Sequence, residues 1–174
     1  PQIVAQYASD PRIRYLRNPE DLGAIGNFNR CLDLVEAPHY AILSHDDFFN
    51  APTALEEALA VLKDHPEVGV VYSDVAWVDA QGGPIAEKRM PFRGRTAGPE
   101  LSRRCLVEGR NHFGVPVLLR TSAVRGVRYD PAYPLTGDVD FSIACMNRAP
   151  AAFLPSAAIA IRFHGGNGTM RRFG

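Results

Sequence analysis

Features that mark several specialised protein classes are scarce in this sequence of 174 residues. Cysteine occurs only three times, at widely spaced positions, and this odd number argues against the disulfide framework of a small secreted domain. No apolar run approaches the roughly 18 residues that a membrane-spanning helix needs. The formal net charge is zero, from 19 basic and 19 acidic side chains, so no bulk field favours nucleic acid or anionic lipid. We therefore expect a cytoplasmic protein with reduced thiols, no transmembrane segment and no nucleic-acid partner.

The composition is that of an ordinary globular domain, with 46% apolar and 22% charged residues, and we expect one domain over residues 1–174. Apolar residues recur at strand spacing in some segments and at helical spacing in others. The expected strands cover residues 12–18, 40–44, 68–79, 115–120 and 157–164. The expected helices cover residues 24–35, 53–65, 100–108 and 138–148, after the end of a helix in residues 1–10. Strands separated by helices predict an α/β fold with a mostly parallel sheet flanked by helices.

The helix that follows Pro52 shows the most complete local pattern. Thr53 and Glu56 have the spacing of a capping box, and Leu55, Leu59 and Leu62 are expected to form its buried stripe.

Residues 84–98 are rich in Pro, Gly, Lys and Arg without periodicity, and we expect a loop there that closes over a ligand.

The stretch "YAILSHDDFF", residues 40–49, places two neighbouring carboxylates directly after an apolar run. In open α/β sheets, ligands bind beyond the carboxyl ends of strands, where Asp46 and Asp47 are expected to lie. Hard oxygen ligands of this kind suit Mg²⁺ or Mn²⁺ bridging to a phosphate. The alternative is that one of them caps the following helix, which is a common use of Asp. We call this pair, Asp46 and Asp47, the acidic step.

Three further residues have both a structural and a functional interpretation. Asp138 and Asp140 open a helix in "LTGDVDF", where an Asp commonly caps the helix or interacts with its dipole, but Asp138 also follows a loop that could cover a pocket and could act as a general base. His164, in "IRFHGGNG", ends a strand as the acidic step does, and could be either a structural histidine or a metal ligand.

Taken together, these motifs resemble those of family 2 glycosyltransferases, enzymes with the Rossmann-like GT-A fold that use nucleotide-sugar donors. The resemblance keeps the motif order over nearly the whole chain. Its quoted parts are the Asn-bearing helix and acidic stretch in "LGAIGNFNRCLDLVEAPHYAILSHDD", then "VGVVYSD", the "GD-x-D" before a helix, and "IRFHGGNGT".

This resemblance implies a role for each candidate residue. The acidic step falls on the signature that holds a divalent metal, Mg²⁺ or Mn²⁺, and the donor diphosphate, and His164 falls near that metal. Asn29 and Asp140 are expected to help bind the donor. Asp138 falls on the catalytic base, which takes the proton of the acceptor hydroxyl in a single displacement with inversion. The implied partners are a UDP- or dTDP-linked sugar donor and a carbohydrate or lipid-linked acceptor, at the inner face of the membrane.

The sequence departs from the family pattern in three ways. Ser44 stands where the signature has its first acid, and Gly137 stands where a Glu normally precedes the base. The opening strand-helix-strand unit of the family has no counterpart, so we expect an amino-terminally truncated GT-A domain that forms a homo-oligomer through the flank left open. Two alternatives to a hexosyltransferase stay open. Gly137 and the missing unit favour a non-catalytic nucleotide-sugar-binding or interaction module, and the Asp and His residues alone would suit a metal-dependent phosphohydrolase.

Overall fold

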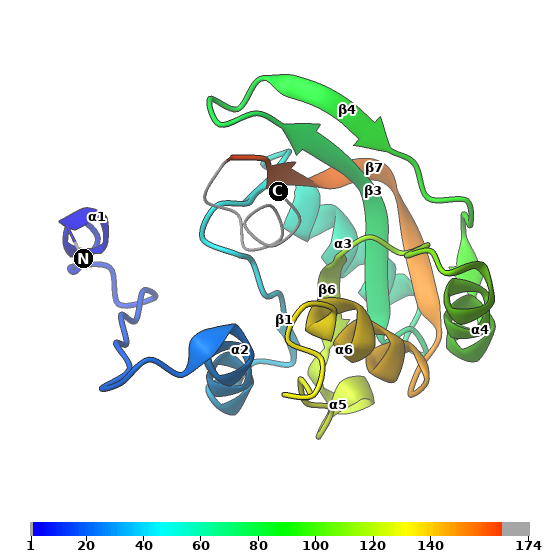
Figure 1. Ribbon diagram of the computed structural model, residues 1–174, viewed down its shortest axis with the longest axis horizontal. Helices are drawn as coiled ribbons and strands as arrows, with labels where there is room; N and C mark the ends of the chain where they lie inside the picture. Colours follow the sequence, from blue (N-terminus) through cyan, green and yellow to red (C-terminus); the bar gives the residue numbers. More distant parts are fainter. Residues whose placement is uncertain (1, 165–174) are drawn as a thin grey trace.

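The computed structural model describes residues 2–164, which form one mixed sheet with helices on both faces (Figure 1). The helices are α1 (Gln2–Ala5), α2 (Gly23–Asp33), α3 (Ala54–Asp64), α4 (Gly98–Glu108), α5 (Thr121–Val124) and α6 (Gly137–Met146). The strands are β1 (His39–Tyr40), β2 (Phe48–Phe49), β3 (Val70–Val78), β4 (Pro84–Lys88), β5 (Arg95–Thr96), β6 (Pro116–Arg120) and β7 (Ala151–Arg162). The predicted α/β class is confirmed.

The strand directions differ from the mostly parallel sheet that we expected. The strands run in the order β1-β6-β3-β7-β2, with β4 paired to β3 and β5 paired to β7. Only the long central pair, β3 with β7, is parallel among the described strands, and the other pairs are antiparallel. Part of the reason is local, since β3 and β4 are joined by a short turn that can only produce an antiparallel pair.

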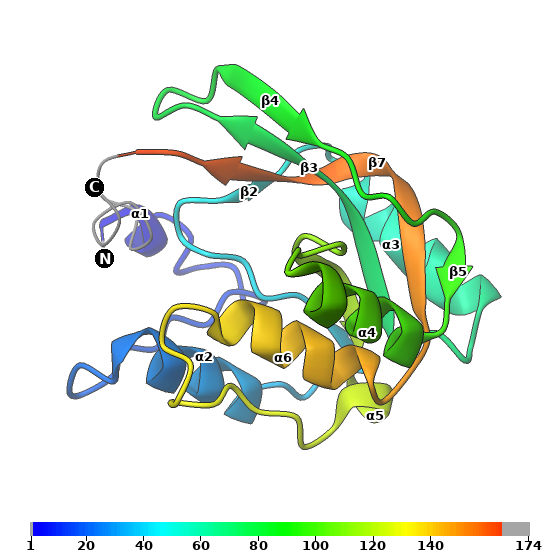
Figure 2. The same cartoon turned by 45° about the vertical axis from the view of Figure 1, so that its right-hand side comes forward.

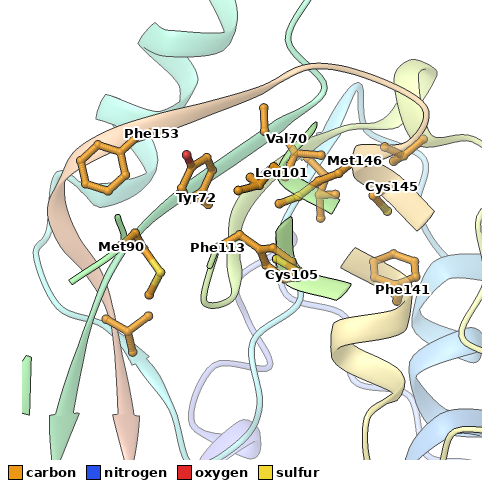
Figure 3. Close-up of a cluster of buried hydrophobic side chains, with 14 of the residues drawn as sticks. Val70, Tyr72, Met90, Leu101, Cys105, Phe113, Phe141, Cys145, Met146 and Phe153 are labelled. Atoms are coloured by element: carbon orange, nitrogen blue, oxygen red, sulfur yellow. The ribbon is translucent and has the colours of Figure 1, made fainter. Parts of the chain in front are cut away.

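Alternation along β3 divides the core between the two faces of the sheet. Val70 and Tyr72 point into a core covered by α2, α4 and α6, whereas Val71 points into a second core under α3. Figure 2 shows α4 and α6 on the side of the sheet opposite α3. Figure 3 shows the larger core, in which Leu101 of α4 and Met146 of α6 meet the side chains of β3.

Helices α4 and α6 approach so closely that only glycine fits where they meet. Gly98 begins α4, and a Cβ atom there would lie 1.7 Å from the carbonyl oxygen of Met146. It would also lie 2.5 Å from the carbonyl oxygen of Ala149. Because both carbonyls belong to the main chain, neither can move aside as a flexible side chain could. This contact fixes the start of α4 against the end of α6.

Four predicted helices are present as α2, α3, α4 and α6, but two details of α3 are wrong. Its buried face consists of Ala54, Ala58 and Leu62, and Leu55 is exposed. Thr53 precedes the helix as expected, but its hydroxyl donates to Glu57 Oε1 at 2.7 Å and forms no capping bond. Small alanines allow the helix to lie close to the sheet, which spacing alone could not reveal.

Three predictions for extended segments and loops are corrected. Residues 12–18 form no strand. Of the strand expected over residues 40–44, only Tyr40 lies in a strand, as the second residue of β1, which pairs with the end of β6. Residues 84–98, predicted as a loop, contain β4 and β5. In each case the outcome depends on which partner strand lies alongside, and that information is not local.

Residues 2–22 lie apart from the sheet, as Figure 1 shows for α1. They meet the rest of the chain through exposed contacts such as the Asn18 to Asn27 side-chain hydrogen bond of 3.0 Å. Within residues 2–164, no helix is both long enough and apolar enough to cross a membrane.

Candidate active site

The antiparallel pairing of β2 with β7 brings the acidic step to the end of the last strand. Phe48 lies opposite Ala160 and Phe49 opposite Ile159, so the residues before β2 meet the residues after Ile161. The turn is closed by a hydrogen bond of 3.2 Å from the Asp47 amide to the Ser44 carbonyl. Candidate residues more than 110 positions apart in the sequence therefore meet at one edge of the sheet.

Asp46 and His164 are in direct contact. Asp46 Oδ2 lies 3.1 Å from His164 Nε2, and Asp46 Oδ1 lies 3.8 Å from Nδ1 of the exposed His45. The Asp46 side chain is 17% exposed and that of His164 is 29% exposed, so both can be reached from solvent. The structure thus brings together two of the three residues that we predicted as metal ligands.

Asp47 is half-buried and contacts the main chain of β7. Its Oδ1 accepts a hydrogen bond of 3.1 Å from the backbone amide of Arg162. Burial raises the pKa of the Asp47 carboxyl above its ordinary value, the Arg162 amide opposes this shift, and the charge of Asp46 adds to it. A nearby cation would lower the free-energy cost of ionising Asp47 in the folded chain.

The donor set is compatible with a small divalent cation, although the described residues do not form a complete site. Two ligands of one Mg²⁺ or Mn²⁺ ion, each about 2.1 Å from it, lie about 3 Å apart, as the Asp46 oxygen and the His164 nitrogen do. Residues 2–164 contain no group of three or more His, Cys, Asp or Glu side chains placed to hold a metal. Further ligands would have to come from phosphate oxygens of a bound substrate or from water, as is usual for Mg²⁺.

Asp138 lies in the first turn of α6, on the rim of a cavity of about 40 Å³. The cavity is lined mainly by apolar side chains, and it includes Ile42, which belongs to the segment that leads to the acidic step. A cavity of this size is too small for a sugar ring. Asp138 is exposed, so a substrate would reach it from the solvent side.

Gly137, which precedes Asp138, is buried against α2. A Cβ atom at this position would lie 2.6 Å from Ile25 Cδ1. A glutamate, which the family pattern favours here, would therefore require Ile25 to move. The glycine at position 137, where the family pattern has a glutamate, thus fits the close packing of Ile25 from α2.

Asn29 contacts the loop that leads to Asp138, and Asp140 lies two residues after Asp138 in α6. Asn29 of α2 holds the main chain of Tyr129 from both sides, since its Nδ2 donates to the Tyr129 carbonyl and its Oδ1 accepts from the Tyr129 amide, each at 2.9 Å. Burial raises the pKa of Asp140, and the charge of Asp130 adds to this shift. Donor binding by Asn29 and Asp140 stays a prediction.

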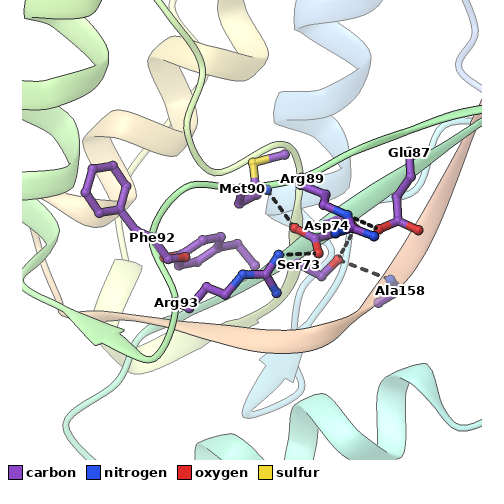
Figure 4. Close-up of polar contacts among 9 residues, drawn as sticks. Ser73, Asp74, Glu87, Arg89, Met90, Phe92, Arg93 and Ala158 are labelled. Atoms are coloured by element: carbon purple, nitrogen blue, oxygen red, sulfur yellow. Dashed lines mark hydrogen bonds and ion pairs between the residues drawn. The ribbon is translucent and has the colours of Figure 1, made fainter.

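A buried carboxylate fixes the segment that we expected to close as a loop (Figure 4). Asp74 of β3 accepts a hydrogen bond of 2.6 Å from the Met90 amide and forms an ion pair of 3.0 Å with Arg93. The Arg93 guanidinium also lies 4.6 Å from the centre of the Phe153 ring. These contacts hold Met90 and Arg93 against the sheet, with Met90 in the core and Phe92 packed against it.

Sequence reasoning missed Arg162, which contacts the acidic step through both its main chain and its side chain. One signal was available: an arginine follows the apolar "AAIAI" at a strand end, where a charged side chain needs partners. Its partners could not be inferred, because they lie more than 80 residues away in the sequence.

Comparisons with known proteins agree with this architecture. Residues 1–126 match the family model described as "Glycosyl transferase family 2". An uncharacterized glycosyltransferase of Methanocaldococcus jannaschii, MJ1057, is 22% identical over 151 residues, which cover 83% of this chain and 49% of that protein. The uncharacterized protein MT1568 of Mycobacterium tuberculosis is 29% identical over 168 residues, which cover 88% of this chain and 51% of that protein.

A crystal structure of S. aureus TarS in complex with UDP has a similar fold, with a TM-score of 0.71 at 18% sequence identity. The match covers 94% of this chain and 47% of the TarS chain, and it confirms the expected GT-A fold. The chain thus spans about half the length of the proteins that it matches.

Proposed function

The chain belongs to glycosyl transferase family 2, and from this membership we propose that it forms part of a hexosyltransferase that uses a nucleoside-diphosphate sugar. The observation that supports this proposal most directly is the contact of 3.1 Å between Asp46 and His164 at the edge of the sheet. Family membership gives the reaction class, and this contact supports the location that we propose for the donor diphosphate.

In this proposal, Asp46 and His164 hold Mg²⁺ or Mn²⁺, with Asp47 beside them. When bound, the cation supplies positive charge that neutralises the leaving diphosphate. Asp47, whose pKa is raised by burial, becomes easier to ionise beside that charge. His164 then contributes a neutral imidazole nitrogen, and Asp46 contributes a carboxylate oxygen.

Asp138 is the proposed general base. Its exposed carboxylate takes the proton of an acceptor hydroxyl while the hydroxyl oxygen attacks the anomeric carbon, so that transfer occurs in one displacement with inversion. Asn29 supports this region by holding the main chain of Tyr129 before α6. Asp140 lies two residues further along α6 and is the alternative base.

We propose a UDP- or dTDP-linked donor, and the UDP bound to the similar TarS fold supports a nucleoside diphosphate. The acceptor is a carbohydrate or a lipid-linked hydroxyl compound, used at the cytoplasmic face of a membrane. The exposed apolar residues before α2, described below, support self-association of the 174-residue chain.

Calorimetry on the full-length protein tests the proposed donor site. We expect UDP to bind in the presence of Mn²⁺ and to bind much more weakly with EDTA. Asp46→Asn should raise the Kd for UDP in Mn²⁺ roughly tenfold or more, because a ligand of the cation is lost. Asp64→Asn, a change in an exposed residue at the end of α3, is the control and should leave the Kd unchanged. An unchanged Kd in Asp46→Asn would contradict this location of the site.

Turnover assays separate the transferase from its two alternatives. Release of the sugar only when an acceptor is present supports the transferase. The buried glycine before Asp138 favours a binding module, which would bind UDP-sugar without turnover. Release of phosphate from simple esters would indicate a phosphohydrolase.

A further inference from the structure

We propose that Arg162 is a positioning residue that fixes the acidic step by tying it to the turn between β3 and β4. This inference rests on the proposed function, since it assigns a role within the proposed donor site. Arg162 ends β7, and it lies opposite Val78 of β3 in the parallel pair. It therefore stands between the acidic step on one side and residues 79–83 on the other.

Arg162 donates hydrogen bonds to the acidic step from both its side chain and its main chain. Its side-chain Nε donates to the main-chain carbonyl of Asp46 at 3.1 Å, and its own amide donates to Asp47 Oδ1 at 3.1 Å. Its guanidinium also lies 5.2 Å from the centre of the Phe48 ring. One residue thus contacts three consecutive positions, and the main chain of Asp46 is held while its carboxylate meets His164.

Toward the turn, Arg162 Nη1 donates to the Ala80 carbonyl at 2.9 Å and lies 3.5 Å from the Asp79 carbonyl oxygen. Hydrogen bonds within residues 79–83 hold the turn itself in place. Asp79 Oδ1 accepts from the amides of Gln81 and Gly83, and the Asp79 amide donates to the Gly83 carbonyl at 2.8 Å. The carbonyls that receive the guanidinium are therefore fixed independently of the acidic step.

The shape of the guanidinium suits this bridge. Nε and Nη1 are held in one plane and donate in different directions, so that one side chain reaches both loops. A lysine ammonium keeps the positive charge but offers a single point of donation. The proposal therefore requires the planar guanidinium, and Arg162→Lys should weaken UDP binding although it keeps the positive charge.

Arg120 provides a matched control. It lies at the end of β6, and its guanidinium also donates to main-chain carbonyls, those of Leu62 and Val68 among them. These carbonyls belong to the end of α3 and the start of the β3 region, away from the acidic step. Substituting either arginine removes similar bonds, but only Arg162 contacts the proposed donor site.

The experiment compares Arg162→Lys and Arg162→Gln with Arg120→Gln in the full-length protein. Calorimetry measures the Kd for UDP in Mn²⁺, and hydrogen exchange without metal or UDP measures protection of residues 46–49 and 79–83. We expect both Arg162 variants to raise the Kd about tenfold or more, as loss of a supporting contact at a metal site does. We also expect faster exchange in both segments. Arg120→Gln should lower the Tm without changing the Kd.

Two results would overturn the inference: an unchanged Kd in Arg162→Gln, or an equal rise of the Kd in Arg120→Gln. A wild-type protein that binds no UDP in Mn²⁺ would instead contradict the proposed function. In that case the exchange data still decide, because unchanged protection of residues 46–49 in Arg162→Gln would show that Arg162 does not hold the acidic step.

Discussion

At the scale of single residues, the two carboxylates of the acidic step have different environments although they are neighbours in sequence. Asp46 directs its side chain toward His164, whereas Asp47 accepts a hydrogen bond from the amide of Arg162. Like charges side by side repel, and the charge of Asp46 adds to the raised pKa of Asp47, while each carboxylate has its own partner. In the proposed site, Asp46 would contact the cation directly and Asp47 would lie beside it.

The base assignment leads to a prediction for Asp138→Asn. Because the amide cannot accept the acceptor proton, turnover should fall by about a hundredfold or more, while the Kd for UDP in Mn²⁺ stays nearly unchanged. Steady-state kinetics and calorimetry on the same preparation test this separation. Asp140→Asn is the comparison, and if it causes the loss of turnover instead, the base is Asp140.

The candidate residues were predicted from the sequence to different extents. Asp46 and His164 were predicted because each lies shortly after an apolar run, and α/β folds bind ligands at strand ends. The strand before Asp46 nevertheless ends at Tyr40, and Asp46 lies just before β2 instead. The role of Arg162 could not be predicted, because its bonds to Asp46 and Ala80 exist only once β2, β3 and β7 lie side by side. Likewise, the spacing of Gly137 gave no sign that Ile25 packs against it.

At the scale of elements, α4 shows how local charge pairing stabilises a helix that also supports the core. Glu100 lies in its first turn and receives hydrogen bonds from Arg103 at 3.1 Å and from Arg104 at 2.8 Å. These two arginines hold the pKa of Glu100 at about 2, below the ordinary value of 4.5. Such i,i+3 and i,i+4 pairs are exposed, so salt weakens them.

A pH-dependent contribution to stability follows from this lowered pKa. Since the pKa of Glu100 is lower in the folded than in the unfolded chain, its contribution is present above about pH 4.5 and is lost as the pH falls toward about 2. Glu100→Gln should therefore lower the Tm slightly at pH 7, and the difference should shrink in acid and in high salt. Thermal melts of both proteins from pH 7 to pH 3 measure this.

Glu56→Gln serves as the control for that prediction. Glu56 also lies in the first turn of a helix, but Leu59 and Ala60 occupy the positions three and four residues later. A change in Tm that has the same acid and salt dependence in Glu56→Gln would attribute the effect to the helix dipole rather than to the arginines.

Helices were predicted better than strands, and the physical reason is the range of the interactions. The periodic apolar residues of α2 and the Pro and Gly boundaries of α4 act within a few residues, so the sequence is sufficient. Residues 12–18 have strand-like composition but no partner strand beside them, and they stay irregular. The length of β1 is likewise set by its pairing with the end of β6.

At the scale of the whole molecule, two cores on opposite faces of one sheet hold β3 and β7 rigidly, and the site lies where β7 ends. Residues 2–22 lie outside this sheet, as Figure 1 shows for α1. That segment carries exposed apolar side chains, among which Tyr15 is 52% exposed and Leu16 is 55% exposed. Exposed apolar surface of this kind favours association.

We therefore expect the 174-residue chain, produced alone, to self-associate through residues 2–22. Burying one large apolar side chain contributes roughly 1.5–3 kcal/mol, so two or three such residues can stabilise a weak dimer at micromolar to millimolar concentrations. Leu16→Glu should shift the chain toward monomer in sedimentation velocity. Leu106→Glu is the matched control, because Leu106 is 70% exposed but lies on α4. If the wild type is monomeric at high concentration, or if both variants dissociate it equally, then residues 2–22 are not the surface that associates.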